Sequence, residues 1–171
     1  MRRHGWTLNE RLVVTGLLAQ IAVTCGLLID RVPPPALVNE SPSLARGVYL
    51  RDWGGVAGRG AVVAFAQPGV ARDYLGRWGM PSDVLLLKRV AAVGGDPVCE
   101  EDGVVRTPER TVRVRGRDRS GLRLPRWTGC RTLTDGELFV LGDTETSFDS
   151  RYFGPVRVEQ LTGVYKEGVR W

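Results

Sequence analysis

The sequence predicts a mainly β domain that follows one N-terminal transmembrane helix. Residues 12–29 (LVVTGLLAQIAVTCGLLI) carry no charge and a single Gln. A helix of that length spans roughly 27 Å, just enough for the apolar core of a bilayer. After it, short apolar runs alternate with Gly, Pro and Asp, at spacings too short for repeated βαβ units. We therefore expect residues 1–30 to form a cytoplasmic N-terminus with a membrane anchor, and residues 31–171 to form one exported domain.

Charges on the two sides of the apolar run predict its orientation. Arg2, Arg3 and Arg11 precede the run, whereas Asp30 and Arg31 nearly cancel after it. The positive-inside rule then keeps the N-terminus in the cytoplasm and exports the rest, so membrane lipid is an expected partner. A cleaved signal peptide is the alternative, but the run is long for one and no Ala-x-Ala step follows it.

Elements of the exported domain are predicted from hydrophobic patterning. Pro33–Pro35 is typical of a stiff extended spacer. Residues 70–75 suggest one short helix, and the alternation in Thr111–Arg117 predicts a strand with its arginines on one face. The remaining apolar runs predict strands at Gly47–Leu50, Ala61–Phe65, Val84–Val93, Glu137–Leu141 and Leu161–Tyr165.

Basic residues concentrate in one stretch of a chain whose net charge is +5. Residues 106–131 hold nine arginines against Glu109 and Asp118. This pattern is typical of a solvated strand face, and the alternative is a patch that attracts anionic lipid or an acidic partner. We expect no nucleic-acid partner, because the stretch lies in the exported part and only Trp127 offers a stacking ring nearby.

The lysine and histidine content restricts the chemistry. The only His is His4, so the exported domain has none for a Ser-His-Asp site and lacks the commonest zinc ligand; we expect no metal and no organic cofactor. Of the 24 basic residues only Lys88 and Lys166 are lysines, and Lys88 ends the apolar run Val84–Lys88. Burial would lower the pKa of Lys88 and let it accept a proton from a serine hydroxyl. The alternative is a strand lysine that reaches solvent.

Two cysteines, Cys99 and Cys130, belong to the predicted exported part. An oxidising compartment favours a disulfide between them, which would contribute roughly 3 kcal/mol by constraining the unfolded chain. Two unpaired thiols are the alternative.

Three ordered segments carry a family resemblance. They are Ser43-x-Ala-x-Gly-x-Tyr49, then Leu87-Lys-Arg-Val-x-x-x-Gly-Gly-Asp96, then Gly142-Asp followed by Ser147-x-Asp-Ser-Arg-Tyr-Phe-Gly-Pro155. Together they resemble the type I signal peptidase (S26) superfamily, and most closely its conjugative-transfer branch of the TraF type. The resemblance covers roughly residues 37–166 and the predicted anchor.

The resemblance implies a fold, an activity and a location. The fold would be the β fold shared by signal peptidases and LexA-like proteins. The activity would be that of a serine endopeptidase with a Ser-Lys dyad in a bacterial inner membrane, its domain facing the periplasm. Its substrates would be membrane-tethered precursors, such as pilin-like proteins of conjugative transfer. The implied roles are nucleophile for Ser43, general base for Lys88, supporting acid for Asp149, oxyanion hole for Ser41 and the Ser43 N–H, and base-orienting contacts for Ser147 and Arg151.

Some positions depart from the family pattern, and other functions remain open. Ala45 and Gly94 stand where proline is usual, and the last segment is one residue shorter than in general signal peptidases. A general signal peptidase would share the same chemistry. A self-cleaving LexA-type repressor would need a DNA-binding motif where this chain has its apolar run. An anchored β module without activity is the third alternative.

Overall fold

The residues that the computed structural model describes are 8–29 and 32–171. They fall into two units, Met1–Pro34 and Pro35–Trp171. The first unit contains helix α1 (Leu8–Ile29). Within the described residues, no helix combines the length and the apolarity that crossing a membrane requires. The charges that predict orientation at Arg2, Arg3, Asp30 and Arg31 lie outside the described residues.

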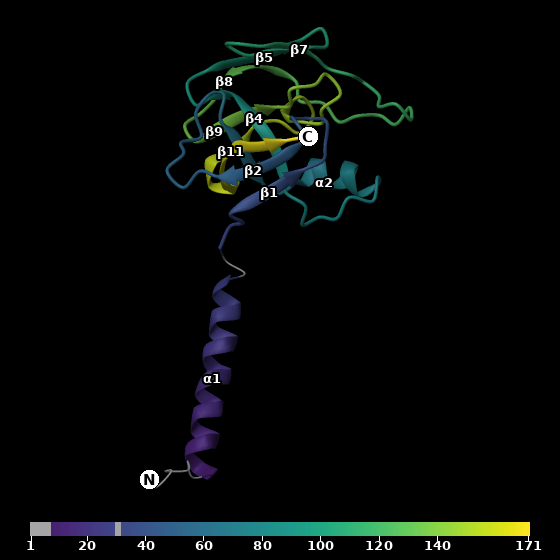
Figure 1. The fold of residues 1–171 in the computed structure, drawn as a ribbon. Helices are drawn as coiled ribbons and strands as arrows, with labels where there is room; N and C mark the ends of the chain where they lie inside the picture. Colours follow the sequence, from purple (N-terminus) through teal and green to yellow (C-terminus); the bar gives the residue numbers. More distant parts are fainter. Residues whose placement is uncertain (1–7, 30–31) are drawn as a thin grey trace. The chain divides into compact units, whose positions relative to one another are not determined.

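The second unit consists mainly of two antiparallel sheets, which confirms the mainly β prediction. The larger sheet has the order β1-β2-β11-β3-β4-β9-β10, and the smaller one β7-β6-β5-β8. Figure 1 shows β5, β7 and β8 gathered at the end of this unit that is opposite β1. The strands of the larger sheet are β1 (Ala36–Asn39), β2 (Gly47–Arg51), β3 (Val62–Phe65), β4 (Leu86–Val93), β9 (Glu137–Leu141), β10 (Val156–Arg157) and β11 (Leu161–Arg170). Those of the smaller sheet are β5 (Pro97–Glu101), β6 (Val104–Arg106), β7 (Thr111–Arg113) and β8 (Gly129–Thr132).

The five apolar runs predicted as strands correspond to β2, β3, β4, β9 and β11, and the predicted short helix is α2 (Gly69–Gly76). Two further short helices, α3 (Ser150–Phe153) and the 3₁₀ helix η1 (Val158–Gln160), were not predicted. The strand predicted over Thr111–Arg117 ends at Arg113, because pairing between β6 and β7 extends only from Val104 to Arg106. Exposure still alternates along this stretch, with Thr111, Arg113 and Arg115 exposed.

Strand β4 lies in the interior of the larger sheet. This strand pairs with β3 on one side and β9 on the other, and its side chains join three separate clusters. Val90 packs with Val63 and Val140, whereas Leu87 packs with Tyr49. A strand buried on both faces has few polar positions. Lys88 nevertheless lies within it, paired in register with Val63.

Candidate active site

The predicted nucleophile lies in the loop between β1 and β2, and Asn39 holds that loop in shape. Its side-chain amide donates to the carbonyls of Ser41, Leu44 and Ala45 at 3.0, 3.2 and 3.0 Å. Its carbonyl oxygen accepts from the Ser41 N–H at 3.2 Å. These four bonds satisfy backbone groups that a tight loop would otherwise leave unpaired. As a result, Ser43 sits in a fixed position and is only 5% exposed.

Lys88 reaches this loop from β4. Its Nζ donates to Ser43 Oγ at 2.9 Å, and the lysine is itself only 5% exposed. Burial among apolar neighbours lowers the pKa of Lys88 from 10.5 to about 8, with the charge of Asp149 opposing the shift and that of Arg151 adding to it. A lysine with such a pKa is neutral in a usable fraction of molecules near neutral pH. The alternative of a lysine that reaches solvent is therefore wrong.

Ser41 lies next to the same hydroxyl. Its Oγ donates to Ser43 Oγ at 3.1 Å and accepts from the Ser43 N–H at 3.2 Å. The two donors predicted for an oxyanion hole are thus adjacent.

Asp149 and Arg151 form a buried ion pair behind the pair of Ser43 and Lys88. Asp149 is fully buried and accepts from the Gly142 N–H at 2.9 Å and from two guanidinium nitrogens of Arg151 at 2.8 Å each. Arg151 also donates to the backbone carbonyls of Arg113, Thr144, Glu145 and Ser147. Among the described residues Asp149 makes no hydrogen bond to Lys88, so it acts on the lysine through its charge, and Arg151 braces the loop at 144–147.

The Ser147 hydroxyl is buried and has no hydrogen-bond partner among the described residues. Its predicted contact with Lys88 is therefore not a hydrogen bond in this structure, although both side chains line one cavity. The loop approaches β9 so closely at this point that a Cβ on Gly142 would overlap Ser147. Glycine is thus required at position 142 for reasons of space.

Three residues that hold the site together were not assigned a role from the sequence. Asn39 shapes the nucleophile loop as described above. Arg89 binds Asp143 with two nitrogens at 2.9 and 3.0 Å, and the Asp143 N–H donates to the Ser43 carbonyl at 2.6 Å. This chain of contacts joins β4, the end of β9 and the nucleophile loop. The position of Arg89 directly after Lys88 was the one sequence signal that pointed to this role.

Two adjoining cavities give access to Ser43. The first, of about 240 Å³, exposes Ser43, Lys88 and Ser147 to its interior and is otherwise partly apolar, with Leu75, Met80, Leu86 and Phe148 in its wall. The second, of about 540 Å³, runs between the end of β1 and residues 84–88. Because β1 is the outermost strand of its sheet, an extended peptide can pair with its free edge there.

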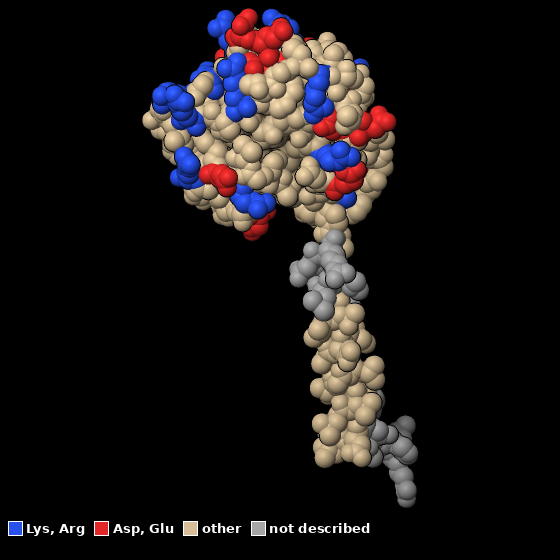
Figure 2. Space-filling view, turned by 180° about the vertical axis from the view of Figure 1, so that it is seen from behind, with Lys and Arg blue, Asp and Glu red and all other residues tan. Residues whose placement is uncertain are grey.

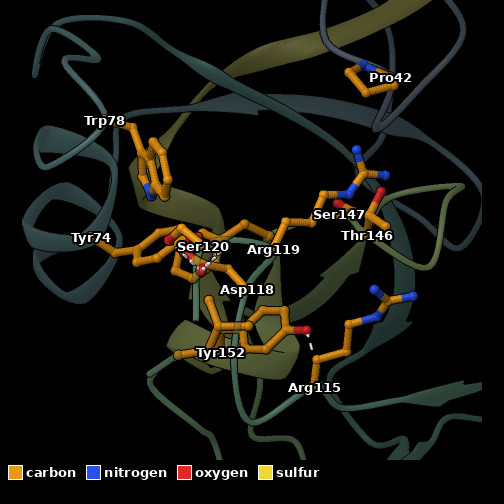
Figure 3. Close-up of a pocket in the computed structure, with 12 residues that line it drawn as sticks. Pro42, Tyr74, Trp78, Arg115, Asp118, Arg119, Ser120, Thr146, Ser147 and Tyr152 are labelled. Carbon is orange, nitrogen blue, oxygen red and sulfur yellow. Dashed lines mark hydrogen bonds between the residues drawn. The ribbon is translucent and has the colours of Figure 1, made fainter. Parts of the chain in front are cut away.

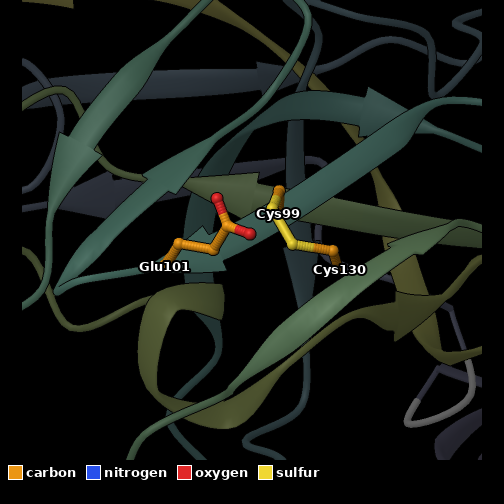
Figure 4. A group of neighbouring side chains, drawn as sticks. All are labelled: Cys99, Glu101 and Cys130. Carbon is orange, nitrogen blue, oxygen red and sulfur yellow. A yellow bond between two sulfur atoms is a disulfide. The ribbon is translucent and has the colours of Figure 1, made fainter.

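Cys99 and Cys130 form a disulfide, as predicted, between neighbouring strands β5 and β8. Glu101 lies beside it (Figure 4). A cysteine binds a metal as a thiolate, and here both sulfurs are bonded to each other.

The arginines of residues 106–131 are mostly paired. Figure 2 shows basic and acidic side chains next to one another on the face that it presents. Ion pairs join arginines 106, 110, 115, 126 and 131 to Glu101, Asp143, Glu145, Glu100 and Glu137, respectively. This supports the interpretation of a solvated face over that of a broad basic patch.

Known proteins are similar to this chain over most of its length. The family model described as signal peptidase, peptidase S26, matches residues 12–169. Two Escherichia coli proteins, both named plasmid transfer protein TraF, are 33% identical over 150 residues and 30% identical over 149 residues. Each alignment covers 80% of this chain, and 84% and 83% of the two relatives. A solved signal peptidase I from Enterococcus faecalis is 22% identical, with a TM-score of 0.37 over 63% of this chain and 94% of that chain. The sequence matches confirm the resemblance predicted from the motifs.

Proposed function

This chain belongs to the peptidase S26 family of signal peptidases, and we propose that it is a membrane-anchored serine endopeptidase with a Ser43–Lys88 dyad. The observation that carries the proposal is the 2.9 Å contact between Lys88 Nζ and Ser43 Oγ, made by a lysine whose pKa burial has lowered so that it loses its proton more readily. A buried lysine beside a serine hydroxyl serves as the base when no histidine is present.

The first half of the reaction forms an acyl-enzyme. Neutral Lys88 takes the proton of Ser43 Oγ, and the oxygen attacks the scissile carbonyl carbon. Negative charge develops on the carbonyl oxygen, where the Ser43 N–H and the Ser41 hydroxyl donate to it. The C–N bond then breaks, and the leaving amine takes the proton back from the Lys88 ammonium.

The second half releases the product and restores the enzyme. Neutral Lys88 removes a proton from a water molecule, which attacks the acyl carbon. The bond between that carbon and Ser43 Oγ breaks, and the serine recovers its proton from Lys88. Through both halves, the pair of Asp149 and Arg151 keeps the loop at 144–147 in place.

We propose the location from the sequence of residues 12–29, eighteen residues without a charge. They would anchor the chain in a bacterial inner membrane, with the N-terminus in the cytoplasm and the peptidase domain in the periplasm. The substrates would then be membrane-tethered precursors that are cut just beyond their apolar segment. The name of the two relatives, plasmid transfer protein, favours precursors of conjugative transfer such as pilin-like proteins.

Two other functions stay open. A general signal peptidase would use the same residues and would differ by cutting many unrelated precursors. An inactive module would keep the fold and cut none. Cleavage of a panel of exported precursors separates the three.

The test is cleavage of a co-expressed precursor, preferably one encoded beside this gene, by wild type and by Ser43→Ala and Lys88→Ala. Lys166→Ala is the matched control, because Lys166 is the second lysine and its side chain is 73% exposed on β11. We expect wild type and Lys166→Ala to cut, and both dyad variants to leave the precursor intact. Full cleavage by Lys88→Ala would remove the lysine from the mechanism.

A further inference from the structure

A third cavity, which the proposed mechanism does not use, adjoins the candidate active site. It has a volume of about 290 Å³ and is shown in Figure 3. Pro42, Thr146, Ser147 and Phe148 line both this cavity and the one that contains Ser43 and Lys88. This cavity therefore adjoins the one that contains Ser43 and Lys88, and a peptide bound at Ser43 would pass close to it.

Stacked aromatic rings form one wall of this third cavity. Tyr74 stacks on Phe148 with ring centres 4.4 Å apart, and Phe148 stacks on Tyr152 at 5.1 Å. Trp78 lines the cavity at one end (Figure 3) and is 56% exposed. A flat apolar wall of this size accepts one bulky apolar side chain. Since Phe148 lies between Ser147 and Asp149 in the chain, the occupant would contact the candidate catalytic loop itself.

The rim of this cavity has an excess of positive charge. Asp118 is already engaged: it accepts from Tyr74 Oη at 2.9 Å, from the backbone N–H groups of Ser120 and Leu122, and from the Ser120 hydroxyl. Arg115 faces Glu145 at 3.7 Å. Arg119 makes no ion pair or side-chain hydrogen bond with any residue described, and Figure 3 shows it extending across the cavity toward Thr146 and Ser147.

The position of the cavity identifies which part of a substrate would enter it. One flank of a bound peptide pairs with the free edge of β1 in the groove along residues 84–88. The other flank leaves Ser43 past Pro42, in the direction of the aromatic wall. This flank would therefore meet the apolar pocket formed by the aromatic wall and then the unpaired guanidinium of Arg119.

We propose that this cavity is a substrate subsite for the flank that does not pair with β1, and that it selects a bulky apolar residue next to an acidic one. The proposal rests on the proposed peptidase function. Arg119 would bind the carboxylate, and the wall of Tyr74, Phe148 and Tyr152, together with Trp78, would hold the apolar side chain.

The test uses the full chain in detergent and reporter peptides built around the cleavage site of a cut precursor. A Phe-Asp pair is moved through the four residues on each side of the cut, and is compared with Phe-Lys and Gly-Asp at the same positions. On one flank only, we expect kcat/KM to be higher for Phe-Asp than for Phe-Lys or Gly-Asp. The ratio of Phe-Asp to Phe-Lys should be about fivefold, as an exposed ion pair gives. Arg119→Glu should reverse the preference for Asp over Lys, and salt should weaken it in wild type.

Arg123→Glu is the matched control, since it makes the same charge change in the same loop without lining the cavity. It should leave the preference of wild type unchanged. Equal kcat/KM for Phe-Asp and Phe-Lys at every position, or equal effects of Arg119→Glu and Arg123→Glu, would overturn the subsite.

A binding measurement separates this proposal from the peptidase proposal. The Ser43→Ala chain is titrated with the Phe-Asp and Gly-Lys peptides while tryptophan emission is recorded. We expect tighter binding of Phe-Asp and a change in emission that disappears when Trp78→Phe is added. Such binding by a chain whose wild type cuts nothing would support the subsite and contradict the peptidase. Equal binding of both peptides, or a change that persists in Trp78→Phe, would contradict the subsite alone.

Discussion

Lys88 and Arg151 are both buried cations of one site, and they are held in opposite ways. Arg151 is paired with Asp149 and donates to four further backbone carbonyls. Among the described residues the Lys88 side chain makes one hydrogen bond, to Ser43 Oγ, and the lysine otherwise lies in an apolar strand. A cation with its donors satisfied stays charged and stabilises a loop, whereas one with a single neutral partner gives up its proton easily. A buried positive charge thus has a structural role in Arg151 and, under the proposed mechanism, a chemical role in Lys88.

The largest effect, on cleavage, is expected when Lys88 can no longer lose its proton. Lys88→Arg keeps the charge and the length of the side chain, but a guanidinium does not deprotonate in proteins. We expect cleavage to fall by roughly a thousandfold or more, within the range for loss of a general base. Lys166→Arg should cut as wild type does. Substantial cleavage by Lys88→Arg, measured in membranes, would contradict the assignment of the base.

The next largest effect is the loss of stability on removal of the buried Arg151 charge. Arg151→Met leaves Asp149 buried without its partner and opens the loop at 144–147, so we expect a loss of roughly 3–5 kcal/mol in the free energy of unfolding. Urea unfolding monitored by circular dichroism measures it. Arg157→Met, which removes an exposed pair with Glu159, should change the same quantity by about 1 kcal/mol or less. A loss no larger for Arg151→Met than for Arg157→Met would refute the structural role.

Removal of the Lys88 charge should have the opposite effect on the free energy of unfolding. Lys88→Met removes a charge that is poorly solvated, so we expect an inactive protein that is more stable at pH 7 by roughly 1–3 kcal/mol. The pH dependence of the free energy of unfolding supplies a second test of the lowered pKa of Lys88. The pKa of Lys88 lies at about 8 in the folded chain and at 10.5 when unfolded, so between these values the unfolded state binds more protons and stability rises with pH. Subtracting the Lys88→Met profile from that of wild type should isolate this rise, and a difference that stays flat would contradict the lowered pKa.

The smallest effect concerns how nearby carboxylates change the pKa of Lys88. The charge of Asp149 raises the pKa of Lys88, so Asp149→Asn should move the acid limb of the kcat/KM profile to lower pH. Asp143→Asn removes a weaker influence of the same sign and should move it less. A shift to higher pH in Asp149→Asn would mean that the carboxylate acts by some route other than its charge.

The sequence predicted the parts of this site that depend on local pattern. Lys88 was identified because one of only two lysines ends an apolar run, and the strands at Val84–Val93 and Glu137–Leu141 because apolar residues dominate them. The functions of Ser43, Asp149 and Arg151 came from the resemblance, since a lone serine or a short acidic loop has no pattern of its own.

What the sequence did not predict depends on contacts between distant segments. Asn39 acts through loop closure around Ser43, and the partner of Arg89, Asp143, is 54 residues further along the chain. In the smaller sheet β7 lies within the strand predicted over Thr111–Arg117, but β5, β6 and β8 were missed, for another reason. They are short, and β8 is exposed at all four positions, so it lacks the alternation that marks a strand.

The protonation of Lys88 can be measured directly, because the chain has only two lysines. Labelling the lysine Nζ atoms with ¹⁵N gives two side-chain signals, and Lys166→Arg assigns them. The structure predicts that the Nζ shift of Lys88 titrates with a pKa near 8. A Lys88 signal that stays in its ammonium form up to pH 10 would contradict the claim that burial prepares this lysine to act as a base.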